Sequence, residues 1–231
     1  MRDREHDDDE TLQHTASRSG RLYSGQPADF TRPGHSRNPA AYGRTREWGF
    51  GGLPAGERPT QRPTGPTPGP GGAVLARHLL DRPEVVAGRR VVDLGAGSGL
   101  VAIAAAKAGA AAVTAVDVDA NAIAAIGLNA AVNGVNILVV TADIIEAPPP
   151  EETDILVVGD LFYDPALALR VMAFLRRCQA SGIEVLIGDP HRAYLPQKEL
   201  QRIATHAVPD FGGGRGGDPV QAGVFSLVSN S

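Results

Sequence analysis

The sequence has little cysteine, lysine or tryptophan. Its one cysteine, Cys178, excludes an internal disulfide and a metal site built from several thiolates, and we interpret it as a packing residue. No uninterrupted apolar run approaches the roughly 20 residues that cross a bilayer. The first residues also lack the apolar segment of a signal peptide. We therefore expect a cytoplasmic protein with no membrane partner and no metal site.

The chain also lacks a strong excess of charge. Its 231 residues carry a formal net charge of −4 and a pI near 5.9, so bulk electrostatics do not favour a nucleic-acid partner. Hydrophobic residues make up 42% of the chain, which is enough for a sizeable core. The length predicts one domain plus a tail, or at most two small domains.

Residues 1–72 are rich in Gly, Pro, Arg, Ser and Thr and show no sustained helical or strand period. Such a segment buries too little apolar surface to offset the entropy lost when it is ordered. We predict a disordered tail over 1–72 and a folded domain over 73–231, whose first helix begins near Ala73.

The predicted domain is organised around a glycine-rich turn. Residues 90–99 form an apolar run that ends in Asp93 and is followed by Gly95, Gly97 and Gly99. We predict a buried parallel strand, a tight turn and a following helix. Glycine allows the backbone to close around a ligand at the carboxyl end of the strand.

The next apolar run, 112–117, ends in Asp117, which lies 22 residues after Gly95. At that place a carboxylate can accept hydrogen bonds from both ribose hydroxyls of a nucleotide. A dinucleotide fingerprint requires glycine where this chain has Leu100. The pattern therefore predicts a site for a ligand with one nucleoside, and a purely structural unit is the alternative.

The rest of the chain alternates apolar runs with amphipathic stretches. The expected strands cover 137–140, 154–159, 183–188, 204–208 and 224–228, and the expected helices cover 119–133, 166–177 and a stretch from Gln197. Asp119 is expected to cap its helix, whose buried stripe is Ile123, Ile126, Ala130 and Ala131. This alternation predicts an α/β domain, a Rossmann-like doubly wound sheet of seven strands.

Polar side chains follow two of these expected strands. Asp143 comes after the third strand, where it can accept a hydrogen bond from an adenine amino group. Asp160 and Tyr163 come after the fourth strand and place a carboxylate and a phenol at the carboxyl edge of the sheet. For both acids the alternative is an aspartate that forms a turn.

These motifs resemble those of the class I, seven-strand methyltransferases that use S-adenosylmethionine (SAM). The similarity is greatest to the protein lysine methyltransferases that act on the electron transfer flavoprotein β subunit. It lies in the residues from Asp93 to Ala106, in Asp160-x-x-Tyr163, and in those from Gly188 to Pro196. The resemblance implies transfer of a methyl group from SAM to a lysine ε-amine of a protein.

The resemblance also assigns roles to the matching residues. Six residues are expected to hold SAM, namely Asp93, Gly95, Gly97 and Gly99 at its methionine part, Asp117 at its ribose and Asp143 at its adenine. Two are expected to be catalytic, Asp160 to orient the amine and Tyr163 to shape the lysine channel. Arg192 and Tyr194 are expected either to bind substrate or to fix their loop.

The chain departs from this lysine-methylating group just before its first helix. The group has an aromatic segment of the type Trp-Ala-x-x-Trp-x-Gly-Gly there, whereas this chain has residues 63–72 and its only tryptophan is Trp48. Arginine supplies 20 of the 22 basic residues, as expected from a GC-rich gene. If the codons for residues 63–72 are read in a frame shifted by two bases, they permit an aromatic segment of this type. Our hypothesis is that residues before about 71 are a frameshifted translation.

Three functions stay open at this point. The first is a lysine methyltransferase whose partner is the electron transfer flavoprotein β subunit or a similar protein. The second is an enzyme that methylates another amine, either of a ribosomal protein, as in the L11 methyltransferases, or of a small molecule. The third is a SAM-binding protein without activity. The L11 enzymes look similar over 93–134 but have an Asn-Ile-x-Ala type motif at 160–163, so they rank second.

Overall fold

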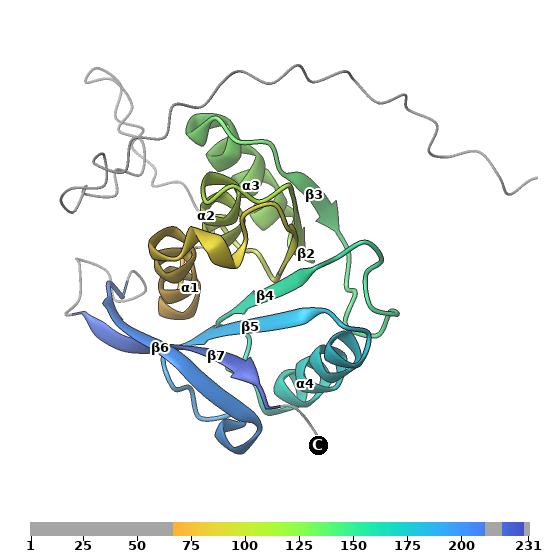
Figure 1. Ribbon diagram of the computed structural model, residues 1–231, viewed down its shortest axis with the longest axis vertical. Coiled ribbons are helices and arrows are strands. Elements are labelled where there is room, and N and C mark those ends of the chain that lie inside the picture. Colours follow the sequence, from red (N-terminus) through yellow and green to blue (C-terminus); the bar gives the residue numbers. More distant parts are fainter. Residues whose placement is uncertain (1–66, 211–218, 229–231) are drawn as a thin grey trace, which may run out of the picture. The chain divides into compact units, whose positions relative to one another are not determined.

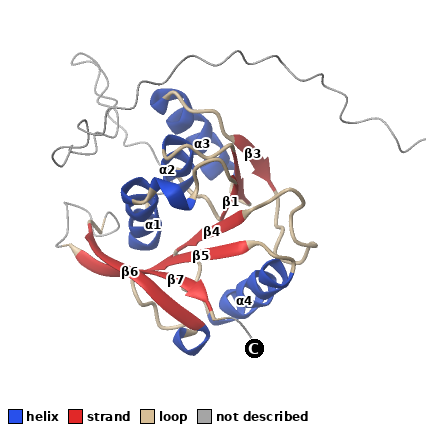
Figure 2. Ribbon diagram, viewed as in Figure 1, coloured by secondary structure: helices blue, strands red, loops and turns tan. Residues whose placement is uncertain are grey.

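A computed structural model describes residues 67–210 and 219–228, which form one sheet with helices on both faces (Figure 1, Figure 2). The strands are β1 (Arg90–Leu94), β2 (Ala112–Asp117), β3 (Leu138–Thr141), β4 (Ile155–Gly159), β5 (Glu184–Asp189), β6 (Leu200–Val208) and β7 (Val220–Leu227). The α-helices are α1 (Pro70–Asp81), α2 (Leu100–Lys107), α3 (Ala120–Asn133) and α4 (Pro165–Ala180), with short 3₁₀ turns at Pro83–Val85 and Gln197–Glu199. None of these helices has the length and apolar character needed to cross a membrane.

The seven strands lie in the order β3-β2-β1-β4-β5-β7-β6. Strands β1 to β5 pair in parallel, and β7 runs antiparallel to both β5 and β6. The strand order reverses between β1 and β4, which is where open α/β sheets bind ligands beyond the carboxyl ends of their strands. The predicted seven-stranded, doubly wound fold is confirmed.

Each face of the sheet has its own core. Val91 and Ile155 belong to the core that α1, α2 and α3 cover, whereas Val92 and Leu156 belong to the core that α4 covers with Phe174. Successive side chains of a strand point to opposite faces, so both faces of β1 and β4 need apolar residues, as at Val91, Val92, Ile155 and Leu156. This explains why these strands appear in the sequence as continuous apolar runs.

Both ends of α3 form as the sequence predicts. The side chain of Asp119 accepts a hydrogen bond of 2.9 Å from the Asn121 N–H, and Gly134 ends the helix in the left-handed conformation. The predicted buried stripe is correct at Ile126 and Ala130, half-buried at Ile123 and wrong at Ala131, which is exposed. Ala122 is buried instead, because the buried side follows every fourth residue from 122 to 130.

Two boundaries differ from the sequence predictions. Helix α1 begins at Pro70, not near Ala73, since proline is accommodated in a first helical turn. The stretch from Gln197 is a single 3₁₀ turn, and β6 takes up most of the expected helix because it pairs with β7 from Leu200 to Val208. The predicted tail and frameshift fall mainly on residues 1–66, outside the described residues, and stay predictions.

Candidate functional site

Five aspartates gather at the carboxyl edge of the parallel strands. They are Asp93 in β1, Asp117 at the end of β2, Asp143 after β3, Asp160 after β4 and Asp189 at the end of β5. The parallel pairing of neighbouring strands brings these ends together. Four of them are predicted site residues, and Asp189 adds a fifth carboxylate.

The glycine turn leaves β1 directly beside β2. The Gly95 and Ala96 N–H groups both donate to the Val116 carbonyl, at 2.8 and 3.1 Å. Gly97 has a φ of 55°, and no atom of the described residues lies within 4 Å of the place where a Cβ would stand. The turn therefore leaves an open cradle at Gly97 that a side chain would fill. Such a cradle fits a ligand that approaches the backbone closely.

Asp117 is connected to this turn. Its Oδ2 accepts a hydrogen bond of 2.8 Å from the Gly97 N–H, and its Oδ1 accepts one of 3.0 Å from the Asp119 N–H. Each carboxylate oxygen has a second lone pair that can accept from a ligand hydroxyl. The predicted ribose-binding carboxylate thus lies against the predicted methionine-binding turn.

Asp93 lies beneath the turn. Only 1% of its surface is exposed, and its Oδ2 accepts a hydrogen bond of 3.0 Å from the Ala102 N–H in α2. Burial raises the pKa of this carboxyl to about 7, and the nearby Asp117 adds to the rise. In this structure Asp93 joins β1 to the first turn of α2.

Asp143 is exposed and already has two partners. Its Oδ1 accepts a hydrogen bond from the Ile145 N–H at 3.1 Å, and its Oδ2 pairs with Arg170 of α4 at 3.1 Å. These two donors hold the pKa of the carboxyl below its usual range. The Ala142 N–H donates to the Asp117 carbonyl, which connects this loop to the end of β2. The ion pair with Arg170 was not predicted, because 27 residues separate the partners.

Asp160 occupies the end of β4 with a φ of 60°, a left-handed backbone conformation that is uncommon outside glycine. Its Oδ2 accepts a hydrogen bond of 2.8 Å from the Gly72 N–H at the start of α1. Its Oδ1 accepts one of 2.8 Å from Nη2 of Arg192. The neighbouring Leu161 contacts the glycine turn, since a Cβ on Gly95 would lie 2.9 Å from its side chain. The candidate amine-binding acid is therefore close to the candidate SAM site.

The segment that follows Asp160 forms the start of α4. The Asp164 side chain caps that helix by accepting a hydrogen bond from the Leu167 N–H at 2.9 Å. Tyr163 is 61% exposed, and Tyr194 in the loop after β5 is 45% exposed. Their proposed contacts with substrate stay predictions.

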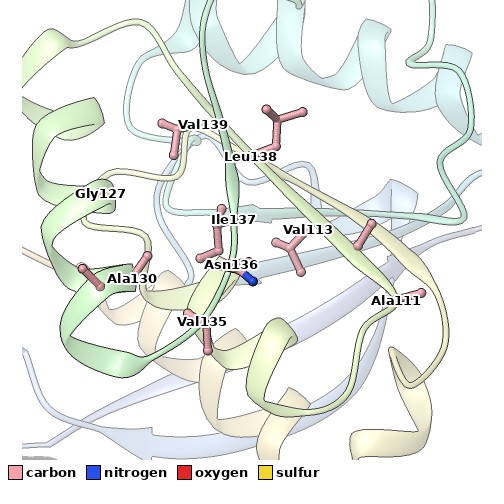
Figure 3. Close-up of a pocket in the computed structure, with 11 residues that line it drawn as sticks. Ala111, Val113, Gly127, Ala130, Val135, Asn136, Ile137, Leu138 and Val139 are labelled. Atoms are coloured by element: carbon pink, nitrogen blue, oxygen red, sulfur yellow. The ribbon is translucent and has the colours of Figure 1, made fainter. Parts of the chain in front are cut away.

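A hollow in the described residues lies elsewhere. Figure 3 shows this cavity of about 620 Å³, which α3 and the amino ends of β2 and β3 line with Ala130, Val113 and Val139. Parallel pairing places it at the sheet edge opposite Asp117 and Asp143. Its lining is mainly apolar, without a titratable side chain, so it is separate from the candidate site. Residues 67–210 and 219–228 also contain no group of three acidic, His or Cys side chains able to hold a metal ion.

Comparisons with known proteins agree with this geometry. A family model for ribosomal protein L11 methyltransferase matches residues 74–176. The electron transfer flavoprotein beta subunit lysine methyltransferase of Danio rerio is 42% identical over 146 residues, which are 61% of this chain and 57% of that protein. The human protein of that name is 41% identical over 143 residues, 62% of this chain and 54% of that protein. The chain thus spans a little over half the length of these curated relatives.

Solved structures share the fold at lower identity. The 16S rRNA N2 G1207 methyltransferase of T. thermophilus, in complex with AdoMet and guanosine, has a TM-score of 0.51 and 24% identity, covering 71% of this chain and 44% of its own. A putative RNA methyltransferase of Pyrococcus horikoshii has a TM-score of 0.51 and 19% identity, covering 69% and 83%. The described domain has the class I methyltransferase fold, and its sequence is similar to lysine methyltransferases.

Proposed function

We propose that this protein, whose described domain has the class I methyltransferase fold, transfers a methyl group from SAM to a lysine ε-amine of a protein. One observation carries the proposal. The Gly97 N–H binds Asp117 at the carboxyl ends of β1 and β2. Asp160 follows β4, across the switch point from β1, and its neighbour Leu161 packs against Gly95. This arrangement offers a nucleoside site and an amine acceptor next to each other.

The residues at the switch point fit SAM. The cradle at Gly97 gives room for close approach to the backbone, and Asp117 has free lone pairs for the ribose hydroxyls. Asp143 is the candidate acceptor for the adenine amino group, and Asp93 supports the turn around the methionine part. When bound, SAM would supply a methyl group on a positively charged sulfur, and the S–C bond would break as the amine nitrogen forms the N–C bond, with S-adenosylhomocysteine as the leaving group.

The protein must present that lone pair. A lysine amine is protonated near neutral pH, and removal from water lowers its pKa because desolvation disfavours the charged form. The Asp160 side chain is only 18% exposed, so an amine that reaches it leaves bulk water. Its carboxylate would accept an N–H of the amine and thereby fix the direction of the remaining lone pair.

The electron transfer flavoprotein β subunit is the proposed substrate. It is named as the target in the relatives that share about 40% of their aligned residues with this chain. A ribosomal protein of the L11 type is the second candidate, and the family model over 74–176 favours it. The acid at 160 and the aromatic residue at 163 favour the first.

The test is methyl transfer in vitro. Purified electron transfer flavoprotein β subunit and ribosomal protein L11 are each incubated with this protein and SAM, and mass spectrometry locates any added methyl group. We expect 14 Da increments, each one added methylene, on lysines of the β subunit. Asp160→Asn should reduce the rate by roughly 10²-fold or more, as expected for a positioned polar group.

Asp164→Asn is the matched control for that variant. Asp164 lies four residues after Asp160 and caps α4, and asparagine is also a good helix cap. The transfer rate of this variant should therefore stay near that of the wild type. Methylation of L11 alone would favour the second candidate. Binding of SAM without transfer to either protein would favour a SAM-binding protein without activity.

A further inference from the structure

The end of β5 and the loop after it contain two buried polar atoms that have no hydrogen-bond partner among the described residues. They are Oδ2 of Asp189 and Nε of Arg192. Leaving a buried donor or acceptor unpaired is costly, so each such group in a native structure requires an explanation. Here one is an acceptor and the other a donor, and their residues are three positions apart, at the end of β5 and in the loop that follows.

Asp189 and Arg192 are already in contact through the backbone. The Arg192 N–H donates to Oδ1 of Asp189 at 2.6 Å, and the Arg192 side chain donates from Nη2 to Oδ1 of Asp160 at 2.8 Å. The guanidinium thus hydrogen-bonds only one of the two carboxylates, although its positive charge also acts on Asp189.

The charge of this cluster is unbalanced. Asp189 is fully buried, and both its burial and the neighbouring Asp160 raise the pKa of its carboxyl, to about 6. When both carboxyls are ionised, the cluster has two negative charges and one positive charge, so one more cation would neutralise it. A substrate ammonium is a cation of the right sign and has donors for a carboxylate.

We propose that Arg192 is a positioning residue that moves from Asp160 to Asp189 when the substrate amine binds Asp160. The inference rests on the proposed function, because it takes Asp160 as the amine-binding acid. In the structure described here the guanidinium occupies the position of the amine on Oδ1 of Asp160. Its transfer to Asp189 satisfies both unpaired atoms and frees Asp160 for the substrate.

The exchange keeps a cation on Asp160 when the substrate arrives as an ammonium. The ammonium then loses its proton to water and becomes the neutral amine that attacks the methyl group. In this proposal Asp189 accepts the guanidinium of Arg192 when that side chain leaves Asp160. Asp189 and Arg192 touch neither the methyl group nor the amine in this account. They act through Asp160, by determining when it is available.

The experiment uses n-butylammonium as a probe of the lysine side chain, added to the full chain with isotope-labelled arginine and aspartate. NMR follows the Arg192 Nε–H and the Asp160 carboxyl carbon. We expect both signals to move together as the amine saturates Asp160, and the Arg192 signal to stay in place in Asp160→Asn. A moving Asp160 signal with an unmoved Arg192 signal would overturn the exchange while leaving the proposed function intact. If neither signal moves, both the exchange and the amine-binding role of Asp160 fail.

Variants give effects of opposite sign. Arg192→Gln removes the internal competitor and should tighten n-butylammonium binding by roughly three- to tenfold, the range of a partly exposed ion pair. Asp189→Asn removes the alternative partner and should weaken binding by a similar factor. Arg202→Gln, at an exposed arginine of β6, is the control and should change nothing. Unchanged affinity in Asp189→Asn, or weaker binding in Arg192→Gln, would overturn the proposal. If Asp189→Asn does not fold, the wild-type spectra and Arg192→Gln still decide.

Discussion

The Gly97 backbone N–H donates a hydrogen bond of 2.8 Å to the side chain of Asp117, across the gap between β1 and β2. This contact fixes the acid that ends one strand against the turn that follows the other. The two residues are 20 positions apart in the sequence and belong to the two motifs that carried the prediction of a nucleoside site. Their direct contact joins these motifs into one site.

Asp117→Asn tests that site. The amide oxygen can still accept the Gly97 N–H, so the turn should be retained, whereas the charge and the acceptor of the Asp119 N–H are lost. We expect the affinity for SAM to fall by roughly tenfold or more, as for loss of a charge-assisted hydrogen bond. Calorimetric titration measures it. Asp119→Asn, which keeps a good helix cap, should bind SAM like the wild type.

Gly188 in β5 lies close to the start of α1, so we expect Gly188→Ala to lower the stability strongly. A Cβ on Gly188 would overlap the carbonyl oxygen of Gly71 and lie 2.6 Å from Leu75. We expect a loss of about 2 kcal/mol or more in the free energy of unfolding, because overpacking displaces α1 from the sheet. Chemical denaturation measures this loss.

Gly127→Ala in α3 is the matched control for that substitution. Nothing among the described residues lies within 4 Å of its Cβ position. It should raise stability by about 0.5–1 kcal/mol, because alanine has the higher helix propensity. A similar loss in both variants would contradict the close packing of α1.

Asp93 predicts a pH dependence of stability. Its pKa rises from an ordinary value of 3.8 to about 7 in the folded chain, so the folded state binds the proton more tightly. Stability therefore falls as pH rises from about 4 to 7, by up to roughly 4 kcal/mol at 1.36 kcal/mol per pKa unit. Asp93→Asn should remove most of this decline, measured by urea unfolding at several pH values. An equal decline in variant and wild type would show that another group causes it.

His78 predicts a slope of the opposite sign. Burial lowers its pKa, and the nearby His206 and Arg82 lower it further. The unfolded chain then takes up the proton first, so stability falls as pH decreases below about 6.5. In His78→Gln the decline below that pH should become shallower, and the same unfolding series tests it. A steeper decline in the variant would contradict the assignment.

Short-range patterns were enough to predict much of the fold. The apolar runs of β1 and β2, the cap at Asp119 and the stop at Gly134 depend on residues close in the sequence. The acids at strand ends could be placed at one edge because parallel strands end together. The same argument applies to Asp189, which ends β5 and was treated only as part of a loop motif.

Contacts between distant residues were not predictable in this way. The glycines at 69–72 look like a spacer by composition, yet the Gly72 N–H binds Asp160, 88 residues away. They are small because α1 begins in close contact with β4 and β5. Strand β6 was mistaken for a helix in part, because its pairing with β7 determines its conformation. The pairing of Arg192 with Asp160 likewise depends on the fold.

The most direct test of this account is a calorimetric titration of SAM into the purified wild-type chain. We predict saturable binding at one site, with competition by S-adenosylhomocysteine, because the glycine turn and Asp117 together form the proposed nucleoside site. Absence of both heat and competition in a folded sample would contradict the assignment of the switch point as a SAM site.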